Sequence, residues 1–492
     1  FFSPTRLAFP INYWNGTATL IALGAPLVLF TATSARNPLA AGLAAAALPL
    51  MALAAYFTYS RGAMIAGLVG LAIFIGFSYD RIPRLVTLLG TALGTALLIS
   101  AAAARPELAD GLLETRAAQD QGGEILLLTV VVCLVVGAAQ AAFTLALGKG
   151  ARPTWVPVPH RPARIASLTL AVVAFLAALA FNVPGQISDG WDEFVASEGS
   201  GAGAERLSSF SGSGRYQLWE VAAEQYGSAP VLGTGAGTYE FWHNRLGDGG
   251  FVRDAHSLFM ETLGELGLIG LALLVGLVLV VLIGGGMATA RAPGRQRSQL
   301  AALLATCVAF VLSAAPDWTW ELAVLPAIFL VCAAPLITAG GRGGGGRRRS
   351  AGWWGGSRPL PWQARAAVVP VAVAATVALA IPLVSESLLQ DSREAAAAGD
   401  LEGALADARD AEAIQPAAAS PRLQQALIFE AAGELAAAEE AAAAAVRREE
   451  TNWRPWLTLA RVQAKRGRAP EAVRSYERAR TLNARSVIFP AD

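Results

Sequence analysis

Long apolar runs, each about the length of a membrane-spanning helix, dominate the first three quarters of the chain. A helix rises about 1.5 Å per residue, so about 20 apolar residues cross the roughly 30 Å of hydrocarbon in a bilayer. About ten such runs occur, at 17–33, 39–57, 62–79, 85–103, 124–147, 164–182, 257–284, 299–315, 321–338 and 366–386. The pattern predicts an all-α protein whose main part is a polytopic transmembrane helical bundle.

The composition supports a membrane protein. Of 492 residues, 54% are hydrophobic and 15% are charged, and the mean hydropathy is +0.46. One soluble core cannot use so much apolar sequence, so the surplus must face lipid. The net charge of +1 gives no reason to expect a nucleic-acid partner or an acidic substrate. Cys133, Cys307 and Cys332 lie inside apolar runs with neither metal-ligand nor disulfide spacing, so they do not indicate a redox compartment.

The distribution of Lys and Arg between the loops predicts the orientation in the membrane. Alternate loops carry basic residues, which favours a cytoplasmic location. These residues are Arg36, Arg81, Arg84, Lys149, Arg152, Arg161, Arg164, Arg291, Arg295, Arg297, Arg347, Arg348 and Arg349. The other loops are 58–61, 104–123, 183–256, 316–320 and everything after 386. We expect this second set, and with it the C-terminus, to face the outside of the cytoplasmic membrane.

Composition also predicts the domain organisation. Residues 1–340 form the expected transmembrane domain, with a long external loop at 183–256. The Gly/Arg/Trp-rich segment 341–365 cannot build a core but suits a cytoplasmic linker that lies on anionic headgroups. A last transmembrane helix at 366–386 leads to a helical domain at 387–492. The first predicted span follows the start of the chain closely, without a signal peptide, so we expect further helices ahead of Phe1.

The C-terminal domain carries an internal repeat. Gly399, Gly433 and Gly467 recur with a period of 34 residues, and Ala404, Ala438 and Ala472 repeat in phase with them. This period, with a small residue at each helix–helix turn, is typical of tetratricopeptide repeats. The alternative is an Ala-rich helical hairpin whose register matches by chance. In both cases we expect a binding surface for a protein partner rather than a catalyst.

Two arginines stand at helix ends on the expected outer side, where positive charge opposes the topology bias. Arg61 lies at the apex of the short turn 58–63 between two predicted spans; its alternative role is a snorkelling anchor. Arg215 opens a predicted helix that extends to about Gln225, with Trp219 on the same face. An arginine in the first helical turn joins the backbone donors in favouring an anion such as phosphate. The alternative is a solvated loop arginine.

One histidine stands on the same side. His256 follows Asp254 where the external loop enters a predicted span, and Glu261 and Glu265 lie close enough in sequence to tune or orient it. Its alternative is a purely structural role. Two arginines and a histidine at one membrane face suit an anionic, lipid-linked substrate. A pyrophosphate leaving group needs cations for its developing charge, and an attacking hydroxyl needs a base.

Two groups of glycines surround this histidine in sequence. The glycines of segment 232–237 follow no predicted strand and precede no clear helix start, so we interpret them as a turn rather than a phosphate-binding loop. Gly264, Gly267 and Gly270 are expected to give the following span a small-residue face for close helix packing.

The order of four motifs resembles that of the O-antigen ligase and polymerase superfamily. The motifs are RLAFPINYWNG, YSRGA, SGRYQLW with a downstream P-x-L-G-x-G, and AHSLFMETLGELGLIG. The resemblance covers roughly residues 1–340 and is most specific at 211–275. The later PDWTWELAVLPA resembles an actinobacterial branch with C-terminal tetratricopeptide repeats. The resemblance implies transfer of a glycan from undecaprenyl pyrophosphate to an acceptor hydroxyl at the outer membrane face, without a metal or nucleotide cofactor.

The same resemblance assigns expected roles to individual residues. Arg61 and Arg215 match arginines that grip the pyrophosphate, and His256 matches the histidine that orients or deprotonates the acceptor. Second-rank candidates for substrate binding are Asn15, Trp219, Asp254 and Asp317. Asn15 or Asp317 could instead cap a helix end. The chain departs from the family pattern at Ser257, where Asn is common.

The sequence leaves the acceptor open, which could be a glycan, a lipid or a protein, and with it the choice between ligase, polymerase and protein-glycosylating activity. Two other classes compete. A solute transporter would place polar groups and broken helices near mid-membrane. A membrane anchor that displays the repeat as a scaffold would tolerate changes at Arg61, Arg215 and His256, whereas deletion of 387–492 would abolish its function.

Overall fold

The computed structural model describes residues 6–109, 115–148, 183–196, 206–207, 209, 211–248, 250–340 and 362–489. These residues form helices and connecting turns without a β-strand, which confirms the all-α fold class. The predicted span 164–182 and residues 341–361 of the predicted linker lie outside these ranges. The chain divides into two compact units, and we describe each by itself. Unit 1 is Phe1–Gly235 with Asp254–Gly346, and unit 2 is Ala236–Arg253 with Arg347–Asp492.

The long helices of unit 1 coincide with the predicted apolar runs. Among the described residues, six helices are long and apolar enough to cross a membrane: Trp14–Ser34 (α1), Pro38–Thr58 (α2), Arg81–Ala103 (α4), Arg116–Ala146 within α6, Leu258–Arg291 (α11 to α12) and Gly294–Ala314 (α13). Two shorter apolar helices are Arg61–Phe77 (α3) and Val324–Ala339 within α14. The chain is therefore a multi-pass membrane protein.

Shorter elements connect or continue these helices. They are α5 (Pro106–Ala109), α8 (Val183–Val195), α9 (Arg215–Ser228), the π-helix η2 (Val280–Gly284), α12 (Gly285–Arg291) and the 3-10 helix η3 (Trp318–Glu321). The full extents of α6, α11 and α14 are Arg116–Gly148, Leu258–Leu279 and Val324–Gly340. The helix α9 follows the predicted Gly/Ser-rich run and continues three residues beyond its predicted end at Gln225.

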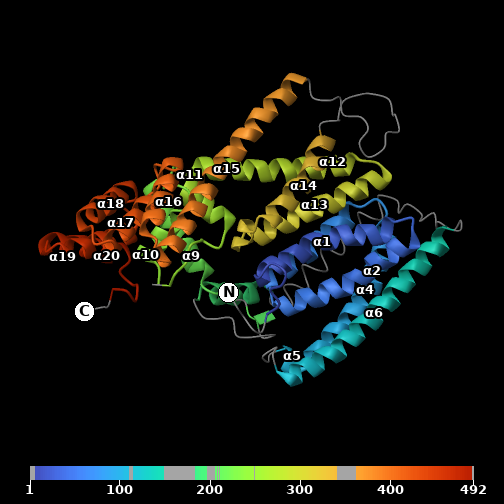
Figure 1. The fold of residues 1–492 in the computed structure, drawn as a ribbon. Helices are drawn as coiled ribbons and strands as arrows, with labels where there is room; N and C mark the ends of the chain where they lie inside the picture. Colours follow the sequence, from blue (N-terminus) through green and yellow to red (C-terminus); the bar gives the residue numbers. More distant parts are fainter. Residues whose placement is uncertain are drawn as a thin grey trace. The chain divides into compact units, whose positions relative to one another are not determined.

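The helix α13 packs in the centre of unit 1, against α1, α3 and α14 (Figure 1). Its buried face is rich in alanines, among them Ala301, Ala305 and Ala309, each fully buried. Small side chains let helix backbones approach closely, which is how helices associate where lipid removes the usual hydrophobic advantage of burial. At Gly70 of α3 an added Cβ would lie 3.2 Å from the Ala305 carbonyl oxygen. The alanine face thus allows α3 to lie directly on α13.

The helix α11 bends where the sequence suggested a continuous small-residue face. Gly267 has φ 64° and leaves the helical conformation, so the prediction that it belongs to a helical packing face is wrong. The residues on both sides of Gly267 pair with the segment 230–235: Gly235 N donates to Glu265 O (2.9 Å), and Leu268 N donates to Pro230 O (2.9 Å). An added Cβ at Gly233 would lie 2.2 Å from the Glu265 oxygen. The glycines therefore let two backbone segments touch.

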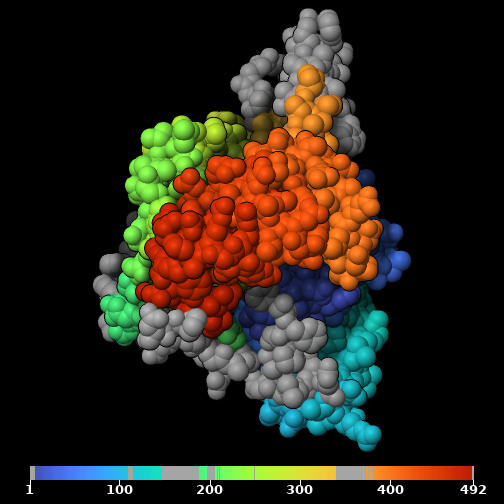
Figure 2. Space-filling view, turned by 60° about the vertical axis from the view of Figure 1, so that its left-hand side comes forward, coloured from blue at the N-terminus to red at the C-terminus, as the bar shows by residue number. Residues whose placement is uncertain are grey.

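Unit 2 consists of α10 (Tyr239–Leu246) and a series of C-terminal helices. These are α15 (Trp362–Ala397), α16 (Leu401–Ile414), α17 (Ser420–Ala431), α18 (Leu435–Arg448), α19 (Trp453–Lys465) and α20 (Ala469–Leu482). The end of α15 pairs with α16, α17 with α18, and α19 with α20. Figure 2 shows the surface of these helices, in orange to red, as one continuous body.

Each helix pair turns at one of the periodic glycines. Gly399, Gly433 and Gly467 have φ values of 88°, 80° and 76°, the left-handed region that favours glycine. In each turn the next residue donates its N–H back to the preceding helix, as Asp400 does to Ala395 O (3.0 Å). The in-phase Ala404 and Ala438 are fully buried. Three helix pairs therefore repeat with the period seen in the sequence, and their assignment to the tetratricopeptide family stays a prediction.

Two features of unit 2 do not follow from the predicted domain boundaries. The helix α15 is 36 residues long and continues without a break across the predicted boundary at 386–387. The predicted span 366–386 lies in α15, which is not among the candidate spans of the described residues, so that span stays a prediction. The helix α10 comes from the predicted external loop but groups with the C-terminal helices.

Candidate active site

A cavity of about 630 Å³ opens in unit 1 at one end of the apolar helices. Its walls come from the start of α1, the turn between α2 and α3, the segments before α9 and before α11, and the end of α13 with η3. Polar and aromatic lining residues include Arg6, Tyr13, Trp14, Asn15, Arg61, Arg206, Arg215, His256, Asp317 and Trp318. Of the seven candidates from the sequence, the cavity brings together Asn15, Arg61, Arg215, His256 and Asp317.

Asp317 connects the arginine of α9 to the start of α1. Its Oδ2 accepts hydrogen bonds from Arg215 Nη2 (2.7 Å) and Asn15 Nδ2 (2.7 Å), and its Oδ1 accepts one from Tyr13 Oη (2.6 Å). Burial and then the Asp317 carboxylate raise the pKa of Tyr13 well above its usual range, so this phenol stays protonated and donates. Asp317 makes no capping bond to η3, and Asn15 bonds across to it, so neither side chain acts as a helix cap.

The local sequence explains why Arg215 points into the cavity. Gly214, with φ 79°, precedes the helix in the left-handed conformation, so α9 starts abruptly at Arg215. The guanidinium also donates to Gly212 O (3.3 Å), and its buried Nε has no partner among the described residues. Arg215 is thus held by one carboxylate while part of its donor capacity is still available.

Arg61 is the first residue of α3 and contacts the segment that precedes α9. Tyr59 ends α2 in the left-handed conformation, with φ 49°, and Ser60 is the N-cap of α3. The Arg61 Nη2 donates to Ser211 O (2.9 Å) across 150 residues of sequence. Its side chain therefore faces the cavity and the α9 segment, which does not fit a lipid-facing snorkelling anchor.

Two further arginines line the cavity, and the sequence reasoning missed both. Arg6 donates to Thr58 O (2.8 Å) and to Asn15 Oδ1 (3.3 Å), and its guanidinium lies over the Trp14 ring at 4.3 Å. Burial, followed by the nearby charge of Arg206, lowers the pKa of Arg6 to about 9, so it still carries its charge at neutral pH. Burial and then Arg215 lower the pKa of Arg206.

Among the described residues that line the cavity, four guanidinium groups therefore face a single carboxylate, Asp317. Positive charges that line one cavity repel one another, and a bound anion relieves that repulsion. Arg6 stands in the RLAFPINYWNG motif, so its position in a motif could have marked it as a site residue. Nothing in the local sequence of Arg206 distinguishes it from an ordinary loop arginine.

His256 has a constrained backbone. Its φ is 51°, a conformation uncommon for residues other than glycine. Before it, Ala255 N donates to Glu261 Oε2 (2.9 Å); after it, Ser257 is the N-cap of α11 and accepts from Met260 N (3.3 Å). Ser257, where the sequence departs from the resembled pattern, therefore serves as a helix cap, a position that suits serine.

The imidazole of His256 is set up as a proton acceptor. Its Nδ1 lies 3.1 Å from Asp254 O, which can only accept, so this nitrogen carries the proton and Nε2 carries the lone pair. Burial is the main cause that lowers the pKa of His256 below its usual value, although Asp254 and Asp317 oppose that shift. The side chain also meets the Trp318 ring edge to face, with centroids 6.5 Å apart. A neutral imidazole therefore lines the same cavity as the arginines.

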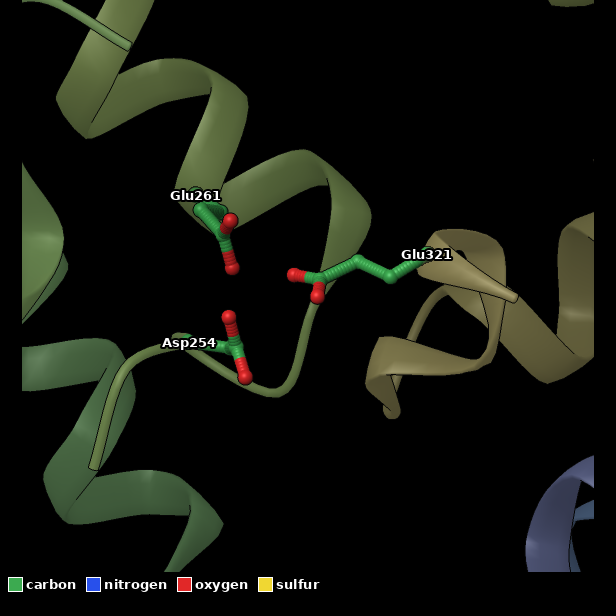
Figure 3. A group of neighbouring side chains, drawn as sticks. All are labelled: Asp254, Glu261 and Glu321. Atoms are coloured by element: carbon green, nitrogen blue, oxygen red, sulfur yellow. The ribbon is translucent and has the colours of Figure 1, made fainter. Parts of the chain in front are cut away.

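Two of the seven candidates are not among the residues that line the cavity. Trp219 lies one helical turn after Arg215 but packs beside Phe194 of α8, with ring centroids 5.5 Å apart. Asp254 joins Glu261 and Glu321 in a group of carboxylates whose oxygens lie within 4.8 Å of one another (Figure 3). Glu261 also accepts the Ala255 amide, so this carboxylate helps to fix the segment before His256.

The carboxylate group is the arrangement among the described residues that could hold a metal ion. The three side chains point toward one another from the segment before α11, from α11 itself and from η3 (Figure 3). Oxygen ligands of this kind suit Ca²⁺ or Mg²⁺. Neither the arginines nor His256 belongs to this group.

Comparison with known proteins points to one family. Residues 125–275 match the family model described as O-antigen ligase. The matched segment contains Arg215, Trp219, Asp254 and His256, whereas Asn15, Arg61 and Asp317 lie outside it. Among curated proteins, no match to the chain is found.

Proposed function

We propose that this chain, which belongs to the O-antigen ligase superfamily through residues 125–275, moves a saccharide from undecaprenyl pyrophosphate to an acceptor hydroxyl. The family match supports a membrane glycan-processing function of the ligase or polymerase kind. The single observation that carries the finer proposal is the cavity in which Arg61, Arg215 and His256 meet at one end of the apolar helices.

The arginines serve the leaving group. As the bond between the saccharide and the pyrophosphate breaks, negative charge grows on the phosphate oxygens. Guanidinium groups match phosphate oxygens with paired donors and stay charged at neutral pH. Arg215, oriented by Asp317, and Arg61, held on Ser211, bind the pyrophosphate, and Arg6 and Arg206 extend the positive surface around it. Fixed cations of this kind stabilise the transition state without reorganisation.

His256 serves the acceptor. Its Nε2 lone pair takes the proton from the acceptor hydroxyl as the oxygen attacks the anomeric carbon. A bond forms between this oxygen and the carbon, the carbon–oxygen bond to the pyrophosphate breaks, and the pyrophosphate leaves with the electron pair. The imidazolium then releases its proton to solvent. Direct attack of this kind inverts the anomeric centre, and the pyrophosphate needs no general acid because it leaves as a stable anion.

The site works at the outer face of the cytoplasmic membrane in this proposal, since the cavity lies at the helix ends opposite the Arg-rich loops. The acceptor is a glycan, a lipid or a protein hydroxyl, and the helix pairs of unit 2 offer a surface for a protein partner. The transporter alternative expects charged groups near mid-membrane, whereas the arginines here stand at helix starts and in loop segments.

The decisive experiment measures release of undecaprenyl pyrophosphate from a lipid-linked glycan by the purified chain in detergent. Arg215→Ala is expected to lower turnover by about 10²- to 10³-fold, and His256→Ala by about 10²- to 10⁴-fold. Arg81→Ala removes an exposed arginine outside the cavity and serves as the matched control. Full turnover in both cavity variants would place the chemistry elsewhere. No turnover by the wild type with any such donor would favour the transporter or the scaffold.

A further inference from the structure

The C-terminal helices of unit 2 hold a segment from the middle of the chain. The segment Ala236–Arg253 comes from the predicted external loop and belongs to unit 2. Arg454 of α19 forms an ion pair with Glu240 of α10 (2.6 Å between Nη2 and Oε1), and the Glu240 side chain is only 13% exposed. Beyond α20, Arg485 Nη1 donates to Gly247 O (2.6 Å). The contact joins residues more than two hundred positions apart.

The helix α10 depends on this contact for its structure. It is eight residues long, and an isolated helix of that length is not stable in water. Yet Tyr239 is fully buried, and His243 and Asn244 are 2% and 5% exposed. Burial of aromatic and amide side chains requires partners, and α20 packs directly against α10. The C-terminal helices therefore fold this part of the loop.

The held segment joins unit 1 at both ends, at α11 on one side and beside His256 on the other. At its start, Gly235 N donates to Glu265 O (2.9 Å). At its end, only Asp254 and Ala255 separate Arg253 from His256. The left-handed backbone of His256 is strained, and such strain persists only where the surroundings fix the chain on both sides. Ser257 and α11 fix the following side.

We propose that the C-terminal helical unit is an intramolecular tether, in which Arg454 and Arg485 are positioning residues that hold the segment before His256 for the transfer reaction. This inference rests on the proposed function of His256. The competing explanation is that α10 only covers the last helix pair, as terminal caps do in helical repeats. That explanation requires the contact between α10 and the C-terminal helices but not its connection to His256.

An insertion separates the two explanations. Gly-Ser-Gly-Ser placed between Arg253 and Asp254 leaves every contact of α10 intact but releases its hold on His256. The tether predicts a fall in kcat of about 10- to 100-fold, because small misplacements of a reacting group are that costly, with KM for the lipid-linked donor changed less than about twofold. The same insertion between Gly345 and Gly346, in the Gly-rich connection to unit 2, is the control and leaves kcat unchanged.

A charge exchange tests the positioning residue itself. Arg454→Glu and Glu240→Arg each place like charges together and should lower kcat, and the double exchange should recover most of it. Amide hydrogen exchange of the full chain gives a readout that needs no substrate. The insertion after Arg253 should speed exchange at Ala255 and His256 at least tenfold, while Gly247 keeps its protection.

The outcomes keep the two proposals apart. Unchanged exchange at Ala255 and His256 after the insertion overturns the tether, even if wild-type turnover supports the proposed function. Faster exchange in a chain that never turns over a lipid-linked glycan supports the tether as a structural device and overturns the proposed function. An unaltered kcat in both the insertion and the single charge reversals, in an active enzyme, leaves α10 as a cap only.

Discussion

Asp317 accepts hydrogen bonds from Tyr13, Asn15 and Arg215, so one buried carboxylate orients three side chains from two distant parts of the chain. A buried carboxylate is costly unless its lone pairs are occupied. Here the three donors occupy the oxygens of Asp317, and the carboxylate in turn fixes the orientation of Arg215. We therefore expect residues that donate to Asp317 to influence catalysis without contacting the substrate.

Tyr13→Phe tests this dependence gently. The variant loses one hydrogen bond to Asp317 but keeps its ring, which stacks on Trp318 at 4.2 Å. We expect turnover to fall roughly fivefold, as the loss of about 1 kcal/mol of orientation implies. Tyr79→Phe alters an exposed tyrosine and is the control. Full activity in Tyr13→Phe would remove Asp317 from the positioning of Arg215.

The titration of His256 makes a prediction about pH. Burial lowers its pKa below the ordinary value of 6.5, so the neutral form that accepts a proton predominates at pH 7. Protonation below that pKa removes the lone pair of Nε2. Turnover should therefore rise with pH through a value below 6.5 and remain level from about pH 7 to 8. A profile of kcat/KM measures this, and His256→Gln should lose the acidic limb. A limb centred above pH 7 would contradict the assignment.

At the scale of elements, the bend in α11 depends on one glycine. Gly267 has φ 64°, and an added Cβ would lie 2.5 Å from Val231 O. Local sequence gives no sign of this bend, because glycines spaced by three residues also suit a straight helix with a small-residue face. Backbone hydrogen bonds from segment 230–235 to the bend replace the hydrogen bonds that an ordinary helical turn would have made.

Gly267→Ala should therefore destabilise the fold. Both the left-handed backbone and the close contact oppose a side chain, at a cost of about 1–3 kcal/mol. The apparent unfolding temperature in detergent should fall by roughly 5 °C. Gly276→Ala, in the same helix and with open space around it, should leave that temperature unchanged or raise it slightly. Equal effects of the two substitutions would mean that the bend is not required.

At the scale of the whole molecule, the distribution of charge predicts the orientation in the membrane. The cavity residues lie at one end of the apolar helices. Arg36, in the turn between α1 and α2, and Arg81, the first residue of α4, lie at the opposite end. Loops rich in arginine stay in the cytoplasm. With the predicted spans at 164–182 and 366–386 included, the C-terminal helices face outward.

Cysteine labelling of intact cells checks this orientation. In a Cys133→Ala background the remaining Cys307 and Cys332 are buried. We expect a membrane-impermeant maleimide to label Ala398→Cys, in an exposed turn, and to leave Arg36→Cys unlabelled until the membrane is opened. The reverse pattern would show that the orientation is inverted. Labelling at both positions would show that one of the two predicted spans does not cross the membrane.

The sequence by itself determined the helices and the periodic turns. A helix satisfies its backbone hydrogen bonds within its own segment, so the apolar length and the position of Gly399, Gly433 and Gly467 were sufficient. It also pointed to Arg215 and His256, which line one cavity, because their motifs are short and continuous. These features are local, and local features can be read from neighbouring residues.

Only the tertiary structure decided which polar side chains share the cavity. Tyr13 and Asp317 are 304 positions apart, and their hydrogen bond depends on how α1 packs against α13. For the same reason Arg206 joins the cavity while Trp219 does not line it. The partner of α10 was equally hidden, since Glu240 and Arg454 are 214 positions apart. Contacts of this kind arise from the return of the chain on itself, which no local pattern encodes.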